Sequence, residues 1–208
     1  MKEIKAHACA EITEKKSRFI ADVFPSASAK EAASLIKDIV KTHYDARHHC
    51  YAFRIAAKAP GAPDLERASD DGEPQGTAGG PILQVLRGED ITNALIVVTR
   101  YFGGTLLGTG GLVRAYTQAA QAGLNAAQIC EKLPAKGISV NVPYAQNDLV
   151  QYLFSQHGIT PEHAQYGASV DYDIIVRQTE AEAFLRELQQ KTDGKLTVRI
   201  TGSFFHAF

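Results

Sequence analysis

Residues 94–114 read ALIVVTRYFGGTLLGTGGLVR, and this stretch organises the N-terminal part of the chain. Its first eight residues are largely apolar and predict a buried strand over 94–101. Glycines follow at 103, 104, 108, 110 and 111, and glycine is used where backbone turns sharply or comes close to another group. A helix is expected over about 110–128. The stretch therefore predicts a strand, a glycine-rich loop and a helix in direct succession.

A second glycine-rich segment lies earlier in the chain. Residues 69–81 read SDDGEPQGTAGGP, and ten of the 17 glycines lie between Gly72 and Gly111. A helix that begins near Gly110, after glycines with exposed N–H groups, offers the positive end of its dipole to an anion. Two interpretations remain open. The glycines either form a phosphate or carboxylate site or allow tight packing of helix against strand.

Two arginines are candidates for contacts with such an anion. Arg100 ends the apolar strand and Arg114 lies one turn into the following helix, so both could supply bidentate contacts. The known nucleotide fingerprints do not match, because the segment 104–108 lacks the Walker spacing and lysine, and Val113 stands where the last glycine of a dinucleotide site belongs. The candidate binding residues are Arg100, Tyr101, Gly103, Gly104, Gly110, Gly111, Arg114, Thr77, Asp71, Glu73 and His48.

Acidic and histidine side chains near these loops raise the question of a metal or a catalytic site. Asp70, Asp71 and Glu73 are the kind of ligand that hard cations prefer, but EF-hand spacing is absent and the segment also reads as an ordinary turn. His48 and His49 point to opposite faces if they lie on a strand, so they do not readily hold one ion. We predict no metal and no cofactor, and we assign no catalytic residue.

The rest of the N-terminal part predicts a mixed α/β domain. The further elements expected are strands near 3–12, 18–24 and 48–56 and a short helix around 79–87. Ser28 and Glu31 form a capping-box pattern at the start of another helix. The Pro/Gly/Asp-rich segment 57–76 predicts a long loop, and long loops within compact domains tend to be functional.

The C-terminal third predicts a ferredoxin-like fold. The expected elements are a strand over 138–142, a helix closed at Gly158, a weak strand within 159–167, a strand over 170–176, a helix over 179–191 and a strand over 196–201. This β-α-β-β-α-β order places both helices on one face of a four-stranded sheet. The open face is expected to be polar, with Ser139, Asn141, Asp171, Asp173, Thr197 and Arg199. Residues 204–208 are expected to pack against the fold or the other domain.

Pro134 marks the expected domain boundary, which divides the chain into 1–134 and 135–208. The first part holds 16 Lys/Arg against 15 Asp/Glu and the second 6 against 8, with a net charge of -1 for the 208 residues. Proteins that bind nucleic-acid backbones non-specifically usually carry a basic excess. The balance of charge gives no indication of such a surface or of a reader of DNA sequence.

The chain is expected to be cytoplasmic and to contact no membrane. Its charged first 16 residues lack the apolar core of an export signal, and its longest aliphatic run, Ala94–Val98, is far too short to span a bilayer. The three cysteines Cys9, Cys50 and Cys130 form no CxxC pair and read as free thiols of a reducing compartment.

The two glycine-rich segments and residues 48–53 (HHCYAF) together resemble the YigZ/IMPACT family. The resemblance spans nearly the whole chain and includes the blocks 69–80, 100–104 and 108–113. It implies an N-terminal domain similar to a ribosomal-protein and elongation-factor domain fold, and a C-terminal domain similar to a ferredoxin-like translation-factor domain. Eukaryotic members are regulators of translation initiation that bind the activator of a starvation-sensing kinase. Bacterial members have no agreed activity, so the resemblance transfers no catalytic role.

The sequence thus favours a non-enzymatic binding protein linked to translation. Its partner is expected to be a ribosome, an RNA or a translation-regulatory protein, contacted through the 69–81 and 100–114 loops. One alternative is an enzyme acting on a small phosphorylated or carboxylated substrate, with Asp71, Glu73 and His48 as acid/base candidates. Another is an interaction module that uses an apolar patch on the open ferredoxin-like sheet, which the polar residues expected there do not favour.

Overall fold

The strand expected over 94–101 lies at the centre of the N-terminal sheet. The computed structural model describes residues 1–57 and 62–208, which divide into two units, Met1–Glu131 and Lys132–Phe208. The boundary expected after residue 134 lies three residues further along. The chain forms an α+β fold with antiparallel sheets, which confirms the predicted fold class.

Unit 1 is built on a five-stranded antiparallel sheet with the order β2-β3-β6-β4-β5. The strands are β2 (Ala8–Glu14), β3 (Ser17–Pro25), β4 (His48–Ile55), β5 (Leu65–Ser69) and β6 (Ala94–Tyr101). A separate two-stranded ribbon pairs β1 (Lys2–Ile4) with β7 (Ile129–Glu131). The expected strand over 3–12 is thus two strands, and β5 lies inside the segment expected to be a loop.

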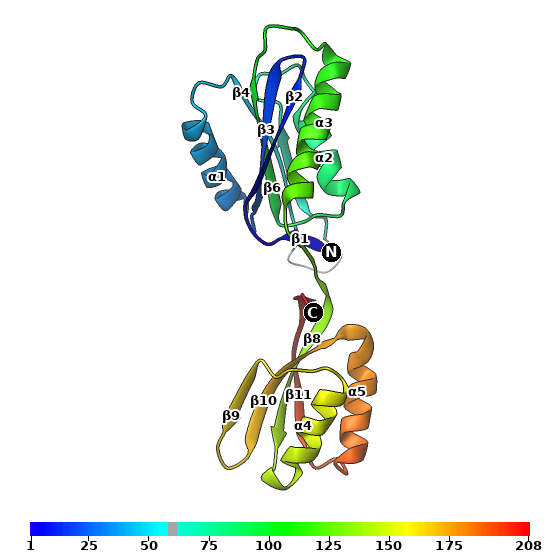
Figure 1. Cartoon of the computed structure of the whole chain (residues 1–208). Helices are drawn as coiled ribbons and strands as arrows, with labels where there is room; N and C mark the ends of the chain where they lie inside the picture. Colours follow the sequence, from blue (N-terminus) through cyan, green and yellow to red (C-terminus); the bar gives the residue numbers. More distant parts are fainter. Residues whose placement is uncertain (58–61) are drawn as a thin grey trace. The chain divides into compact units, whose positions relative to one another are not determined.

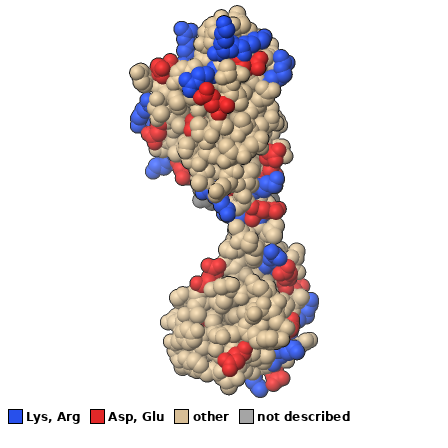
Figure 2. Space-filling model, in the orientation of Figure 1, with Lys and Arg blue, Asp and Glu red and all other residues tan. Residues whose placement is uncertain are grey.

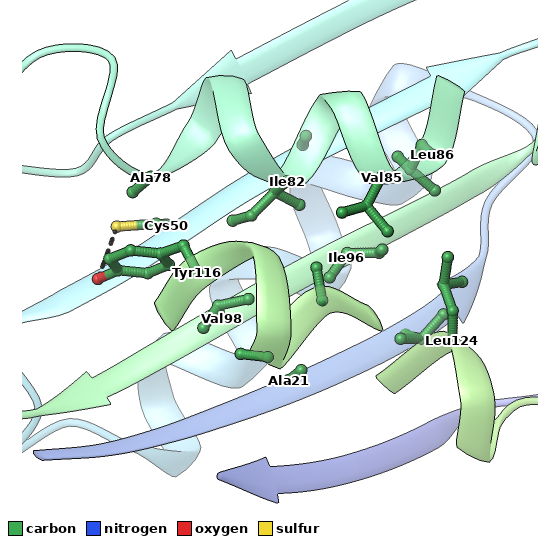
Figure 3. Close-up of a cluster of buried hydrophobic side chains, with 14 of the residues drawn as sticks. Ala21, Cys50, Ala78, Ile82, Val85, Leu86, Ile96, Val98, Tyr116 and Leu124 are labelled. Atoms are coloured by element: carbon green, nitrogen blue, oxygen red, sulfur yellow. Dashed lines mark hydrogen bonds between the residues drawn. The ribbon is translucent and has the colours of Figure 1, made fainter. Parts of the chain in front are cut away.

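Helices cover both faces of this sheet (Figure 1). The helix α1 (Ala29–Thr42) lies on one face, and α2 (Gly79–Gly88) and α3 (Thr109–Ala126) lie on the other. Alternate residues of β6 therefore serve two cores: Ile96 and Val98 pack with α2 and α3, while Leu95 and Val97 pack on the α1 side. Figure 3 shows the first core, in which side chains from α2 and α3 meet on β6.

The expected capping box of α1 is confirmed. The Ser28 hydroxyl accepts the N–H of Glu31 at 3.2 Å, and the Glu31 carboxylate accepts the N–H of Ala27 at 2.8 Å. The Ser28 bond satisfies one of the N–H groups that a helix start leaves without an intrahelical partner, and the Glu31 bond fixes the residue that precedes the N-cap.

Unit 2 has the βαββαβ order predicted for it. Its four-stranded sheet has the order β11-β8-β10-β9 and all neighbouring strands are antiparallel. The elements are β8 (Leu133–Val142), the 3-10 turn η1 (Tyr144–Gln146), α4 (Asn147–Gln156), β9 (His163–Tyr166), β10 (Val170–Arg177), α5 (Gln178–Lys191) and β11 (Thr197–His206). Both helices lie on one face of the sheet and share a core with it (Figure 1).

The open face of this sheet matches the expected polar positions over most of its length. Asn141 lies opposite Asp171 and Thr197, and Ser139 lies opposite Asp173 and Arg199, so all of them share one face. The tail packs against unit 2, which is one of the positions expected for it, and β11 runs on to His206, beyond the expected end of the strand at 201. Its residue Phe204 pairs with Ala135 and packs beside Gly137, which places one aromatic ring on the open face.

Charge is mixed on both units in the view of Figure 2, where basic and acidic side chains are interspersed. The basic ones are most frequent toward the end of unit 1 that carries the start of α3. None of the described helices is both long enough and apolar enough to cross a membrane.

Candidate functional site

A buried ion pair lies at the end of β6. Arg100 is 6% exposed and its Nη1 donates to Glu73 Oε1 at 2.6 Å, with Glu73 itself 9% exposed. The Tyr116 hydroxyl of α3 donates to the same carboxylate oxygen at 2.9 Å. The strand β6, the 70–77 loop and α3 are therefore joined at one point inside unit 1.

The Cys50 thiol extends this network. Its sulfur lies 3.3 Å from the Tyr116 hydroxyl, the dashed contact in Figure 3, and 2.9 Å from the carbonyl oxygen of Asp70. Burial raises the pKa of Cys50 to about 12 and also raises the pKa of Tyr116. The thiol therefore stays protonated near neutral pH, and a thiol is a far weaker nucleophile than a thiolate.

The carboxylates of the 70–77 loop hold the loop in place. Asp70 accepts the N–H groups of Gly76, Ala78 and Gly79 at 2.8, 3.0 and 2.9 Å, and so caps the start of α2. Burial acts to raise the pKa of Asp70, but these backbone donors outweigh it, and the pKa is lowered. The buried Thr77 hydroxyl donates to the Pro74 carbonyl at 2.7 Å. The loop is thus closed by its own hydrogen bonds.

Asp71 connects the same loop to β4. Its Oδ2 accepts the backbone N–H of His49 at 2.7 Å, and its carbonyl accepts Nδ1–H of His48 at 2.8 Å. Because a carbonyl can only accept, Nδ1 of His48 carries the proton and Nε2 is the ring nitrogen left for a ligand. Among residues 1–57 and 62–208, no group of three or more His, Cys, Asp or Glu side chains could hold a metal ion.

The glycines of the 103–111 segment occupy their positions for different physical reasons. A Cβ on Gly103 would lie 2.0 Å from the backbone carbon of Lys16, so this position requires close packing of loop against hairpin. Gly104 and Gly108 have φ angles of +84° and +71°, which only glycine adopts readily. Gly110 has neither a positive φ nor a crowded Cβ position. Packing and turn geometry therefore explain part of the glycine density, and Gly110 is not explained by them.

A hollow of about 430 Å³ opens at the start of α3. We call it the α3 hollow. Its apolar wall consists of Pro74, Phe102, Leu106, Leu107 and Leu112. Its polar wall consists of Arg47, His48, Glu73 and Arg100, and the first residues of α3 complete the rim. The structure therefore brings Arg100, Glu73 and His48 of the predicted candidates together at one surface.

The other predicted candidates lie outside this hollow. Arg114 is exposed and lines a separate hollow of about 70 Å³ with Glu14, Lys15 and the candidate Gly111. Tyr101 points to the opposite face of the sheet from Arg100, where its hydroxyl donates to Asp45 at 2.9 Å. Asp71 and Thr77 are committed to the loop bonds described above.

Arg100 and Arg114, which were expected to contact one anion, therefore line two different hollows of the described residues. The charge of Arg100 is offset by Glu73, and Arg114 lines the neighbouring hollow, with Leu107 in the wall of both. Sequence reasoning also missed Arg47 and the apolar side chains of the loop. Phe102 is 49% and Leu106 is 83% exposed, and two large apolar residues inside a glycine-rich loop were the available signal.

Comparison with known proteins agrees with this architecture. A family model described as the Impact N-terminal domain matches residues 15–124, and a domain of unknown function (DUF1949) matches residues 140–195. The chain belongs to the IMPACT family. The two matched regions fall in unit 1 and unit 2 respectively.

IMPACT relatives match most of the chain. The IMPACT family member YvyE of Bacillus subtilis (strain 168) is 33% identical over 189 residues, which cover 91% of this chain and 85% of that protein. The IMPACT family member YigZ of Escherichia coli (strain K12) is 34% identical over 185 residues, 88% of each. A solved structure titled "Crystal structure of an hypothetical protein" is 32% identical and has a TM-score of 0.58, with 95% of both chains covered.

The human protein IMPACT shares a shorter region with this chain. It is 32% identical over 99 residues, which cover 47% of this chain and 30% of the human protein. The region in common with the human protein is therefore under half of this chain.

Proposed function

We propose that this IMPACT family protein is a non-enzymatic binding protein linked to the regulation of translation, and that the α3 hollow is its contact surface. The observation that carries the proposal is the hollow itself. Exposed Leu106 and half-exposed Phe102 lie on its rim beside Arg47, which combines apolar area with a cation as protein interfaces do. The partner is a ribosome, an RNA or a translation-regulatory protein.

The link to translation rests on family membership. The sequence resembles a family whose eukaryotic members regulate translation initiation, and the model of the Impact N-terminal domain matches residues 15–124 of unit 1. The proposed place of action is the cytoplasm, where translation takes place. The rest of the human protein has no counterpart in this match, so its partners are not transferred to this chain.

The arrangement of candidate catalytic groups supports a binding role over an enzymatic one. Cys50 is buried with a raised pKa, Asp71 is bonded to the backbone of β4, and Glu73 is paired with Arg100. Each group is thus committed to a structural contact. This leaves little free acid or base at the hollow.

His48 is the residue that favours the alternative, an enzyme for a small phosphorylated or carboxylated substrate. Its Nε2 is available to act as a base at the rim of the hollow. A thermal-stability screen with nucleotides, sugar phosphates and small carboxylates separates the readings, because a ligand of the native state raises its stability by mass action. Specific stabilisation that is lost in His48→Ala would favour the enzyme.

The binding proposal is tested with substitutions at exposed positions. Arg100→Ala is unsuitable, because it leaves Glu73 buried without its cation and perturbs folding. We therefore choose Arg47→Glu and Leu106→Ser, with Arg67→Glu on β5 as the matched control in the same unit. Ribosome co-sedimentation and pull-down from lysate are compared for the four proteins. We expect the two hollow variants to lose a partner that wild type and Arg67→Glu retain. Equal recovery of every partner by all four proteins would refute the surface.

A further inference from the structure

The α3 hollow is divided into an apolar half and a cationic half. Phe102 and Leu106 stand exposed on the apolar side, with Leu107 and Leu112 buried behind them. The cationic side holds Arg47, which is exposed and has no hydrogen-bond or ion-pair partner within the described part of the chain. A ligand that fills both halves must therefore carry an apolar group close to a negative charge.

Arg100 adds a donor that the protein leaves unused. Its Nη1 is bonded to Glu73, but its Nε is buried and has no partner among the described residues. The guanidinium carbon lies 5.5 Å from the ring centre of Phe19 and 5.6 Å from that of Phe102, so the cation is held between two aromatic faces. Buried N–H groups are almost always paired in native proteins, so the unpaired Nε is an unusual feature of a residue that lines the hollow.

The start of α3 lacks the capping found on the other two helices of unit 1. Ser28 and Glu31 cap α1 and Asp70 caps α2, whereas Gly108 gives α3 no side-chain cap and its first turn holds no acidic residue. The N–H groups of Thr109 and Gly110 have no acceptor within residues 1–57 and 62–208. Thr109 lines the hollow, so the start of α3 leaves a backbone donor there for one acidic group.

The free positive charge is too small for a run of phosphates. Glu73 offsets Arg100 and places a carboxylate in the same wall, so Arg47 is the main uncompensated charge of the hollow. Nucleic-acid affinity grows with the number of phosphates neutralised, and one free arginine beside a buried carboxylate suits a single carboxylate better. The apolar wall likewise suits an aliphatic or aromatic side chain better than a charged backbone.

We propose that the α3 hollow binds a peptide segment of a partner protein in which an aspartate or glutamate stands next to a large apolar residue. The apolar side chain packs against Leu106 and Leu112, and the carboxylate faces Arg47, Arg100 and the start of α3. The inference rests on the proposed function, since it names the chemistry of the partner at the same surface. It selects a protein partner over RNA.

The test uses random dodecapeptides displayed on phage and selected on the full chain. Enriched peptides are synthesised with a fluorescent label, and their affinity is measured by polarisation alongside a labelled uridine oligonucleotide. We expect enrichment of acidic residues next to Leu, Ile or Phe. We also expect Arg47→Glu and Leu106→Ser to weaken the best peptide by about tenfold or more, the loss that follows from one hot-spot contact, with Arg67→Glu unchanged.

Three results would overturn the inference: no enriched peptide, enrichment without the acidic-apolar pattern, or binding that both hollow variants leave intact. If the oligonucleotide binds, its binding requires Arg47 and no peptide binds, then the ligand of the hollow is RNA and not a peptide. These failures are distinct from failure of the proposed function. If a cellular partner is lost in Leu106→Ser, the α3 hollow remains supported as the binding surface even when no peptide binds.

Discussion

The pair of Arg100 and Glu73 couples the candidate site to the stability of unit 1. Both side chains are buried, and loss of one partner leaves the other as an uncompensated charge in the protein interior. We expect Arg100→Ala to lower the free energy of unfolding by about 3–5 kcal/mol. Urea unfolding followed by circular dichroism measures this.

The double variant Arg100→Met/Glu73→Leu is the control for that prediction. It removes both charges and retains apolar volume, so we expect most of the lost stability to return. A double variant as unstable as Arg100→Ala would show that the unpaired carboxylate alone does not account for the loss, since Glu73→Leu also removes the acceptor of the buried Tyr116 hydroxyl.

Because the Cys50 thiol is buried, we expect the stability of unit 1 to depend on pH in the alkaline range. Burial raises its pKa in the folded state to about 12, above the ordinary value of 9.0. Between these values the unfolded thiol loses its proton and the folded thiol keeps it, so stability is full below pH 9 and falls as the pH rises toward 12. We expect urea midpoints measured at pH 8, 9 and 10 to fall less steeply in Cys50→Ala than in wild type. Identical slopes for the two proteins would contradict the buried, protonated thiol.

At the level of elements, Asp70 decides how α2 begins. It accepts three backbone N–H groups, and an N-cap side chain is worth about 1–2 kcal/mol. We expect Asp70→Ala to lose an amount of this order and to speed hydrogen exchange at Ala78 and Gly79. The pKa of Asp70 is lowered, so its contribution is present above the ordinary value of 3.8 and is lost as the pH falls through the folded pKa. Unchanged exchange at these amides would argue against the cap.

In the loop from β6 to α3 and the first turn of α3, we expect alanine substitutions at two glycines to have opposite effects on stability. Gly103→Ala forces a Cβ into the Lys16 backbone, and we expect a loss of about 1–3 kcal/mol. Gly110→Ala lies in the first turn of α3, where an added Cβ would make an ordinary van der Waals contact with Arg114 Nη1 at 3.7 Å, and alanine favours the helix by up to about 1 kcal/mol. We therefore expect Gly110→Ala to keep or gain stability and to retain binding of any partner held in the α3 hollow, because residue 110 lies outside the lining of that hollow. Denaturation of this variant checks the expected stability, and pull-down with the same variant checks the expected binding.

Particular elements show where sequence reasoning succeeds. The strand over 94–101 and the following helix were predicted because apolar pattern and glycine position are local signals. Strand β5 was missed because Leu65–Ser69 is a short edge strand with little burial, inside a Pro/Gly/Asp-rich segment. The pairing of Arg100 with Glu73 could not be predicted, since it joins residues 27 positions apart and depends on where the 70–77 loop closes.

At the scale of the whole molecule, each unit has a hydrophobic core of its own. The core of unit 2 draws on its four strands and both helices and includes Phe154, Tyr172 and Phe184. We expect residues 132–208, expressed alone, to unfold in one cooperative transition and to bind none of the partners that require Leu106. Absence of a cooperative transition would mean that unit 2 depends on unit 1 for folding.

The central claim is that the α3 hollow is the contact surface of the protein, and site-specific crosslinking in growing cells tests it most directly. A photoreactive amino acid is placed at Leu106 in one strain and at Arg67 in the other, so that both probes are exposed on unit 1. The account predicts a discrete protein adduct from position 106 and none from position 67. An adduct from position 67 alone, or no adduct from position 106 while the partner is still recovered by pull-down, would contradict it.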